Sequence, residues 1–344
     1  MSTPTVLTVI LNYRTAPMTL RAAEAARTAM EGLPGALVIV DNDSRDGSFE
    51  MLTQAVAAQG WEAGGQVRVL QTGHNGGFGA GCNAGIRAGL PDGAAPEFIY
   101  LLNSDAFPAP DAIRRLRDHL QAHPQTGLAG SYIHGPDGEA HVTAFRFPGI
   151  LSEFIGAART GAITRLLAGY DVVLPVPEQT QPVDWLAGAS LMLRRSVLEE
   201  VGVFDEGFFL YFEETDLCRR ARNAGWRADY VRDAEVMHIG SVSTGAKRWS
   251  RQPGYWFDSR RRYFVKHRGR VGAAGATLAR LAGGAIWQAR RIIQRKPRAG
   301  SERFLRDMLA SDLGAAFAAL CPHSAIPRST HPATDAARPQ RSRK

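Results

Sequence analysis

The 344-residue sequence contains few cysteines. Cys82, Cys218 and Cys321 lie far apart and form no CxxC pair. This spacing argues against a disulfide framework and against a zinc site made of thiolates, and it fits a reducing compartment.

Long apolar runs are absent as well. A membrane-spanning helix needs roughly 18–20 consecutive uncharged apolar residues, and the segment 271–287 is interrupted by Arg280. The chain does not open with a basic stretch followed by a long apolar one, because the run 6–11 is short and ends at Asn12. No secretory signal is expected, and we predict a cytoplasmic protein, soluble or peripheral on the inner face of the membrane.

The charge balance is basic. The formal net charge is +8, with 41 Lys and Arg against 33 Asp and Glu. This excess favours anionic partners, which include nucleic acid, phosphorylated small molecules and an acidic membrane surface. No recognised groove-reading module is present, so a nucleic-acid partner is not expected.

Short β-rich apolar runs alternate with amphipathic stretches over the first 125 residues. The predicted strands are 5–11, 36–40, 66–70 and 97–102, and the predicted helices are 18–30, 49–59, 79–90 and 111–122. This alternation predicts an α/β fold with a mostly parallel sheet. Such sheets bind ligands at the carboxyl ends of their strands, where the sequence places the polar or glycine-rich loops NYRT, DNDSRDGS, TGHNGGFGAGCNAG and NSDA.

The third of these loops offers backbone N–H groups that can approach a phosphate closely. Its segment 79–84 matches the dinucleotide fingerprint GxGxxG/A. In an NAD-type oxidoreductase that fingerprint follows the first strand, whereas here it follows the third, which argues against that class.

Two side chains are candidates for a metal or ligand site. Asp105 follows the fourth predicted strand and places a carboxylate at the ligand-binding edge, although for Asp105 taken alone a turn or helix cap is the better explanation. His238 ends an apolar strand before Gly240 and can ligate a metal beside Asp105. A lone histidine is also commonly structural.

Glu213 and Glu214 follow the aromatic run 208–212. A carboxylate beside apolar walls can become a competent general base. The first turn of a helix also favours acids, and both interpretations can hold together. A non-catalytic binding protein would need no such base, so the presence of both Glu214 and His238 favours an enzyme.

After residue 127 the pattern becomes less regular, with a hairpin expected around 134–141. A strand at 185–193, a short helix at 196–201 and a strand that ends at His238 are expected next. From residue 260 the chain is strongly basic and amphipathic as far as residue 292. Such a segment can lie on anionic lipid or pack on the domain as an ordinary amphipathic helix.

The motifs in their order resemble the family 2 glycosyltransferases, especially the bacterial rhamnosyltransferase-like branch. They are VILNYRT, VDNDSRDGS, GHNGGFGAGCNAGI, YLLNSDA, DWLAGASLMLRR, FDEGFFLYFEETDLCRRARNAGW and MHIGSVS, and the resemblance spans Thr5 to Lys266. It implies a GT-A fold, a Rossmann-like, mostly parallel sheet that binds nucleotide diphosphate sugars. We expect a catalytic domain at 1–250, with a nucleotide-binding half at 1–125 and an acceptor and catalytic half at 126–250. A basic helical extension at 251–322 and a disordered tail at 323–344 follow.

The resemblance also implies roles for individual residues on the donor side. Asp41 is expected to contact the nucleobase or ribose of the donor, and Asn12, Asn75, Phe78 and Asn83 to line the same pocket. Asn103-Ser104-Asp105 stands where the family has a DxD-type motif, so Asp105 is expected to hold a divalent cation, Mg²⁺ or Mn²⁺. The first acid of that motif is missing, and His238 resembles the metal-facing histidine of the family.

On the acceptor side, Glu214 is expected to act as catalytic base, Glu213 as its positioning partner and Trp185 as an aromatic platform. The implied function is inverting transfer of a sugar from a nucleotide diphosphate to a hydroxyl of a glycan or lipid-linked glycan in cell-envelope polysaccharide synthesis. dTDP-rhamnose is the favoured donor, with UDP and GDP sugars open. The alternative is a non-catalytic protein that binds nucleotide sugars or glycans.

Overall fold

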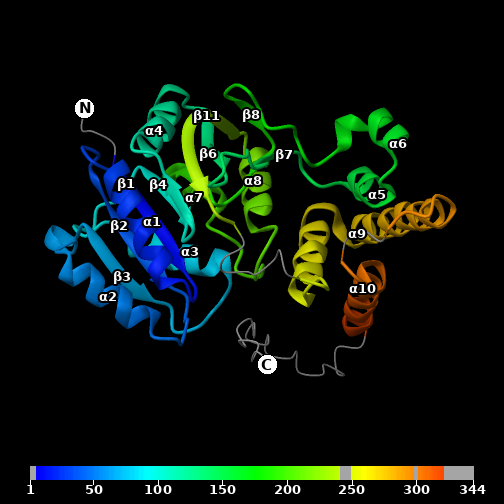
Figure 1. Cartoon of the computed structure of the whole chain (residues 1–344), viewed down its shortest axis with the longest axis horizontal. Coiled ribbons are helices and arrows are strands. Elements are labelled where there is room, and N and C mark those ends of the chain that lie inside the picture. Colours follow the sequence, from blue (N-terminus) through cyan, green and yellow to red (C-terminus); the bar gives the residue numbers. More distant parts are fainter. Residues whose placement is uncertain (1–4, 241–248, 298–300, 321–344) are drawn as a thin grey trace, which may run out of the picture.

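The computed structural model describes residues 5–240, 249–297 and 301–320. The tail predicted at 323–344 lies outside the described residues. Figure 1 shows a large α/β part, with a group of helices, α5, α6, α9 and α10, at one end of the molecule.

The first half of the chain forms the predicted parallel sheet. Strands β1 (Val6–Asn12), β2 (Gly35–Asp41), β3 (Val67–Gln71) and β4 (Phe98–Asn103) pair in the order β3-β2-β1-β4, and every pairing is parallel. Helices α1 (Ala16–Ala29), α2 (Ser48–Ala58) and α3 (Phe78–Ala88) connect them, α4 (Ala112–Ala122) follows, and a 3₁₀ turn (Ala63–Gly65) precedes β3. The predicted βα alternation is therefore confirmed.

The same sheet continues with strands from the second half. β10 (Ser190–Arg194), β6 (Thr126–His134), β11 (Arg227–His238) and β5 (Ala106–Pro108) extend it beyond β4, and β8 (Gln181–Val183) pairs with β11. β10 runs antiparallel to both neighbours, β4 and β6, whereas β11 runs parallel to β6. Helices α7 (Arg195–Val201) and α8 (Glu213–Asn223) lie between β10 and β11 in the chain.

The strand predicted at 185–193 is split in two. β9 (Trp185–Leu186) pairs with β7 (Ala144–Phe145) in a separate two-stranded sheet, while β10 joins the large one. The N–H of Ala187 still bonds to the carbonyl of Thr143, but the carbonyl of Ala189 accepts from Asn103 at the end of β4. The chain changes sheets at Gly188 because its two flanks pair with different strands.

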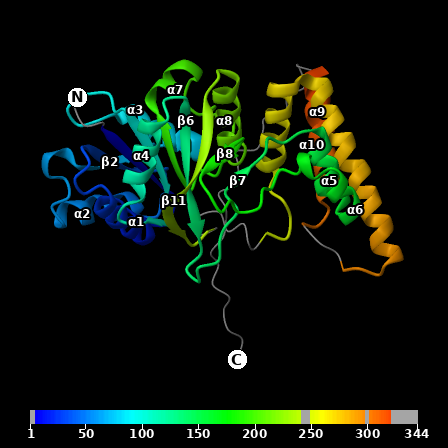
Figure 2. The same cartoon turned by 90° about the horizontal axis from the view of Figure 1, so that it is seen from above.

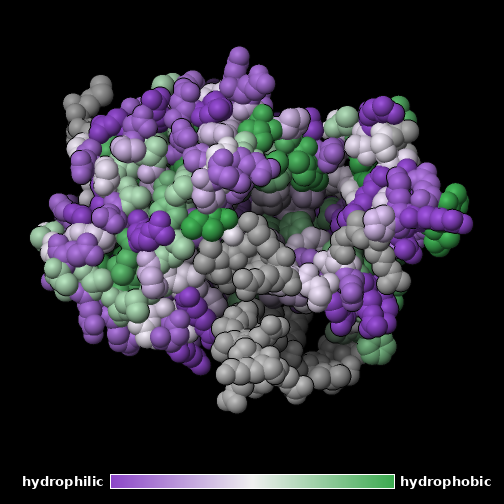
Figure 3. Space-filling model, in the orientation of Figure 1, coloured by the Kyte–Doolittle hydropathy of each residue, from purple (hydrophilic) through white to green (hydrophobic). Residues whose placement is uncertain are grey.

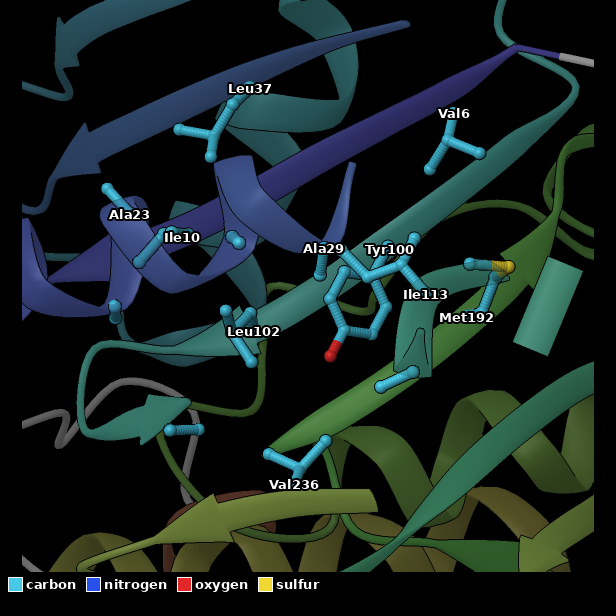
Figure 4. Packing of buried hydrophobic residues seen from close by; sticks show 14 of the residues in the cluster. Val6, Ile10, Ala23, Ala29, Leu37, Tyr100, Leu102, Ile113, Met192 and Val236 are labelled. Carbon is cyan, nitrogen blue, oxygen red and sulfur yellow. The ribbon is translucent and has the colours of Figure 1, made fainter. Parts of the chain in front are cut away.

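Two hydrophobic layers cover the large sheet. In β1, Val6 and Ile10 point to the layer that contains α1, α2 and α4, whereas Leu7 and Val9 point to the layer that contains α3, α7 and α8. This alternation is what the two-residue period of a strand requires. Figure 4 shows part of the first layer, with Tyr100 among the packed side chains, and the hydroxyl of Tyr100 bonds to that of Ser190, 2.8 Å away.

The helical region combines α9 (Gly254–Ile293) and α10 (Phe304–Leu320) with α5 (Ile150–Ala158) and α6 (Gly161–Leu166), and a 3₁₀ turn (Ala168–Tyr170) follows α6. α9 bends at Gly269, whose φ of 68° is left-handed and suits glycine. α5 packs along α9 (Figure 2). Among the helices of the described residues, none is both long and apolar enough to cross a bilayer. The domain boundary predicted near residue 250 stays a prediction, since α5 and α6 precede it and share this region.

Buried charges connect these helices. Glu153 of α5 is 6% exposed and binds Arg260 at 2.6 Å and Arg280 at 3.2 Å, both on α9. The guanidinium of Arg260, a residue 1% exposed, also lies 3.5 Å from the carboxylate of Asp312 on α10. Burying these charges is costly unless each keeps its partner.

Replacing Glu153 with Ala is expected to lower the free energy of unfolding by about 3–5 kcal/mol, because the buried guanidinium of Arg260 and the partly exposed one of Arg280 lose their shared carboxylate. Urea denaturation of the full chain measures the change. Glu199→Ala is the control, since it removes an exposed pair with Arg195 and should cost no more than about 1 kcal/mol. Equal losses in the two variants would contradict the account.

Candidate active site

Polar residues that end neighbouring strands lie side by side at one edge of the sheet. Asn12 of β1 is opposite Asp41 of β2, Asp41 is opposite Gln71 of β3, and Leu11 is opposite Asn103 of β4. The antiparallel strand β10 starts at this edge, and β11 ends there. The predicted convergence of the loops after the first four strands is therefore confirmed.

Asn12 and Asp41 form a fully buried network with Ser44. The amide of Asn12 donates to Asp41 Oδ1 at 2.7 Å, and the backbone N–H of Ser44 donates to Asp41 Oδ2 at 3.2 Å. Asn12 Oδ1 in turn accepts from the hydroxyl of Thr19 at 2.6 Å. The carboxylate is thus held in one orientation by the protein, and its contact with a donor nucleobase stays a prediction.

The glycine-rich loop bends through Asn75 and Gly77. Asn75 Oδ1 accepts from the side chain of Asn42 at 2.9 Å and from the N–H of Gly77 at 3.0 Å. Gly77 has a φ of 91°, and a Cβ there would overlap the carbonyl of Phe209, so only glycine fits. The N–H of Phe78 donates to that carbonyl at 3.0 Å, which joins the start of α3 to the aromatic run before α8.

An open pocket of about 480 Å³ lies beside this loop. Its lining residues are Asn42, Gln71, Thr72, His74, Gly76, Ala80, Ala84 and Glu206. Asn83, one turn into α3, is fully buried, and its amide bonds to both backbone groups of Phe204 and to Glu206. Asn83 therefore holds the segment 204–206 against α3, and its place in a nucleotide pocket stays a prediction.

Asp105 and His238 lie together, as the sequence predicted. His238 Nε2 is 3.0 Å from Asp105 Oδ1, and the carbonyl of Asp105 accepts from the N–H of Ile239 at 3.1 Å. Asp105 is 4% exposed. The ring of His141 lies edge-on to that of His238, with centroids 6.1 Å apart, and no sequence pattern pointed to that neighbour.

A carboxylate oxygen and an imidazole nitrogen are a donor set that suits Mn²⁺ and, less well, Mg²⁺. Within the ranges that the structure describes, no three His, Cys, Asp or Glu side chains form a metal-binding group. Asp105 and His238 could supply at most part of the ligand set of a cation, and metal binding by this pair stays a prediction.

Glu214 reaches the same edge from the first turn of α8. Its Oε1 accepts from the N–H of Gly188 at 3.1 Å, and the carbonyl of the next residue, Ala189, accepts from the N–H of Asn103 at 3.0 Å. A Cβ at Gly188 would overlap Glu214 and touch the ring of Phe78, so glycine permits this approach. The backbone of Gly188 and Ala189 thus links Glu214 to Asn103, the last residue of β4, which lies two positions before Asp105.

The two glutamates differ in exposure. Glu213 is 1% exposed, and its Oε2 has no hydrogen-bond partner among the described residues. Burial, and then the charge of Glu214, raise the pKa of Glu213 well above its usual range. Glu214 is partly exposed, and burial raises the pKa of its carboxyl too. Glu214 is thus the more exposed of the two acids, and its role as a base stays a prediction.

Asp216, two residues further along α8, holds this helix in place. Its buried carboxylate accepts from Arg220 of the same helix and from Lys266 and His267 of α9, each at 2.8 Å. Burial raises the pKa of Asp216, but the hydrogen bonds from His267, Lys266 and Arg220 outweigh it and leave the pKa below its usual value. Sequence reasoning missed this cluster. The only local signal for it is the four-residue spacing from Asp216 to Arg220, which allows an ion pair within one helix.

Trp185 is fixed by neighbours from the small sheet. Its ring stacks on Phe145 with centroids 4.1 Å apart, and its Nε1 donates to the carbonyl of Arg146 at 2.9 Å. One face of the indole is covered, and the predicted contact with an acceptor stays a prediction.

Comparisons with known proteins place the chain in a family. A family model described as glycosyl transferase family 2 matches residues 6–202. The N-acetylglucosaminyl-diphospho-decaprenol L-rhamnosyltransferase of Mycobacterium tuberculosis is 33% identical over 220 residues, which make up 62% of this chain and 69% of that protein.

Two solved structures share the fold. The mannosyltransferase PcManGT from Pyrobaculum calidifontis, in complex with GDP-Man and Mn²⁺, has a TM-score of 0.53 at 16% identity, covering 94% of this chain and 82% of that one. S. aureus TarS 1-349 in complex with UDP-GlcNAc has a TM-score of 0.53 at 13% identity, covering 92% and 81%. At such identities the likeness concerns the fold alone.

The raised pKa of Glu213 predicts how stability depends on pH. The folded state binds this proton more tightly than the unfolded state, so the free energy of unfolding should fall as pH rises above the unfolded value of about 4.3. Glu213→Gln should flatten that decline in urea denaturations between about pH 5 and 9. Glu199→Gln, at an exposed position on α7, is the control, and a Glu213→Gln profile parallel to the wild type would contradict the prediction.

Proposed function

The chain belongs to glycosyl transferase family 2, and from that premise we propose that it transfers a sugar, with inversion at the anomeric carbon, to an acceptor hydroxyl. It is a nucleotide-sugar glycosyltransferase with the predicted GT-A fold. One observation supports the proposed mechanism above all. Glu214 accepts a hydrogen bond from Gly188, and the next residue, Ala189, accepts one from Asn103 at the end of the strand that leads to Asp105.

The proposed reaction is a single displacement. The acceptor oxygen bonds to the anomeric carbon as the bond to the diphosphate oxygen breaks, and the nucleoside diphosphate leaves. Glu214 takes the proton of the attacking hydroxyl, a contribution typically worth about 10²–10⁴-fold in rate. Its raised pKa brings the carboxylate closer to the basicity that proton transfer near neutral pH requires.

Asp105 and His238 are the residues that would hold a divalent cation. When bound, such a cation neutralises negative charge on the diphosphate leaving group. Because the chain has Asn103 where the family motif has its first acid, His238 supplies the second protein ligand. Asn12, Asp41, Asn75, Phe78 and Asn83 complete the proposed donor side.

We propose rhamnose from dTDP-rhamnose as the donor sugar and a polyprenyl-linked glycan as the acceptor. The support is the Mycobacterium tuberculosis relative, whose name specifies transfer of L-rhamnose to a diphospho-decaprenol acceptor. The two solved relatives were captured with GDP-Man and UDP-GlcNAc, so the shared fold accepts several nucleotides. Trp185 is the proposed acceptor platform, and the product would enter cell-envelope polysaccharide synthesis.

The proposed division of labour follows the chain. Residues 1–125 bind the nucleotide, 126–250 carry the acceptor side and Glu214, and 251–322 form the basic helical extension. Peripheral association of that extension with an anionic membrane surface on the cytoplasmic side is part of the proposal, because a polyprenyl-linked acceptor resides in the bilayer.

Glu214→Gln is expected to keep donor binding and to lower transfer by at least about 10²-fold, because the amide cannot accept the proton. A nucleotide-release assay with purified acceptor measures turnover, and titration calorimetry measures donor affinity. Glu214→Asp is the matched control: it keeps the base but shortens it, so partial activity should remain. Turnover close to wild type in Glu214→Gln would remove this residue as the base.

Asp105→Asn should abolish the extra thermal stabilisation that Mn²⁺ adds to a bound nucleoside diphosphate, since the carboxylate that holds the cation becomes neutral. Differential scanning fluorimetry with dTDP, UDP and GDP, each with and without Mn²⁺, measures the effect and ranks the nucleotides. Asp92→Asn, in the exposed loop before β4, is the control. An unchanged Mn²⁺ response in Asp105→Asn would contradict the proposed cation site.

A further inference from the structure

Beyond the bend at Gly269, the solvent-facing side of α9 is uncharged along about six turns, and Gln288 is the one polar residue among its exposed positions. The exposed positions between 271 and 293 are Val271, Ala274, Leu278, Ala282, Ala285, Gln288, Ala289, Ile292 and Ile293. None of them carries a charge. Their spacing of three and four residues places them along one side of the helix, which we call the outer face.

The large side chains of the outer face are strongly exposed. Val271 is 87% exposed, Leu278 66%, Ile292 68% and Ile293 80%. Burying a side chain of this size is worth about 1.5–3 kcal/mol. A contiguous apolar surface of this kind in a basic region marks an interaction site.

The rest of the helical region packs on the opposite side of α9. A Cβ at Gly283 would overlap the backbone of α5 at Phe154, and one at Gly284 would overlap the side chain of Leu305 in α10. These two glycines therefore face the other helices, and the outer face points away from them. Figure 2 shows this part of α9 at the outer end of the molecule, beyond α5 and α6.

Basic residues flank the outer face at both ends. Arg268 and Arg270 precede it, and Arg291, Arg295 and Lys296 lie at its other end, whereas Arg290 donates to Arg159 and Thr160 of the protein. α9 as a whole contains nine Lys and Arg and a single acid, Asp258. Figure 3 shows hydrophobic and strongly hydrophilic surface side by side where α9 ends. An apolar face with arginines around it is the pattern of helices that lie in the interface of an anionic membrane.

We propose that the outer face of α9 docks on an anionic lipid surface. Val271, Leu278, Ile292 and Ile293 enter the boundary between headgroups and acyl chains, and the flanking arginines pair with lipid phosphates. A second copy of this chain is the poorer occupant, because two such faces would bring their arginines together, and like charges across an interface repel.

Docking would also orient the active site. The first half of α9 carries Lys266 and His267, which bind Asp216, two residues after Glu214. The membrane-facing helix is thus joined directly to the helix that bears the proposed base. This consequence rests on the proposed function with a lipid-linked acceptor, and the docking assigns the peripheral association proposed there to one face of α9.

The test is co-sedimentation of the full chain with vesicles. Wild type should bind vesicles of equal parts phosphatidylcholine and phosphatidylglycerol and bind pure phosphatidylcholine far more weakly, since each arginine near the surface adds to the attraction. The double variant Val271→Glu/Leu278→Glu should lose at least about tenfold in partitioning, because two apolar anchors become anionic. Both positions are already exposed, so the fold should persist, as its melting temperature will report.

Met51→Glu/Ala58→Glu on α2 is the matched control, with two exposed positions at the same seven-residue spacing. It should bind as wild type does. Failure of wild type to bind the anionic vesicles, or equal binding by Val271→Glu/Leu278→Glu, overturns the proposal. A third outcome also overturns it: analytical ultracentrifugation shows a wild-type dimer that dissociates in this variant, and neither form binds vesicles. Donor hydrolysis without vesicles should be equal in all forms, which separates failure of docking from failure of the proposed chemistry.

Discussion

The buried carboxylate of Asp216 joins the parts of the molecule on which the site depends. Through Arg220 it fixes the loop before α8, because that guanidinium also donates to the carbonyls of Val201, Gly202 and Val203. Through Lys266 and His267 it fixes α9. Because an unpaired buried charge costs several kcal/mol, none of these elements can separate from α8 cheaply. The first turn of α8, with Glu213 and Glu214, is therefore held rigidly over the sheet edge.

The edge itself follows from simple rules of strand pairing. Parallel strands end together, so Asn12, Asp41 and Asn103 are adjacent although they lie far apart in sequence. The antiparallel strand β10 then brings Gly188 to the same edge, where the absence of a side chain lets Glu214 approach. The proposed catalytic function therefore depends on side chains that rigid helices and strands hold in position, and on glycines that leave space for those side chains.

Sequence reasoning predicted the parts of this arrangement that leave a local pattern. The βα alternation predicted the parallel sheet, and the resemblance placed Asp105 beside His238, as the structure has them. It did not predict the split at Gly188 or the protein contacts that engage Asn83 and Trp185, since these arise from pairings with distant segments. The packing of α5 on α9 depends on the ion pair between Glu153 and Arg260, which lie 107 residues apart in the chain. A contact between residues so far apart leaves no periodic pattern in the sequence.

The central claim is that Glu214 and the pair Asp105 and His238 face one bound nucleotide sugar. A crystal structure of the chain with Mn²⁺ and a nucleoside diphosphate, with the metal located by its anomalous scattering, tests this most directly. The account predicts a manganese peak bonded to Asp105 and His238 and to diphosphate oxygens, with space for a sugar between that diphosphate and Glu214. A manganese or diphosphate bound elsewhere, or a Glu214 separated from it by protein, would contradict the account.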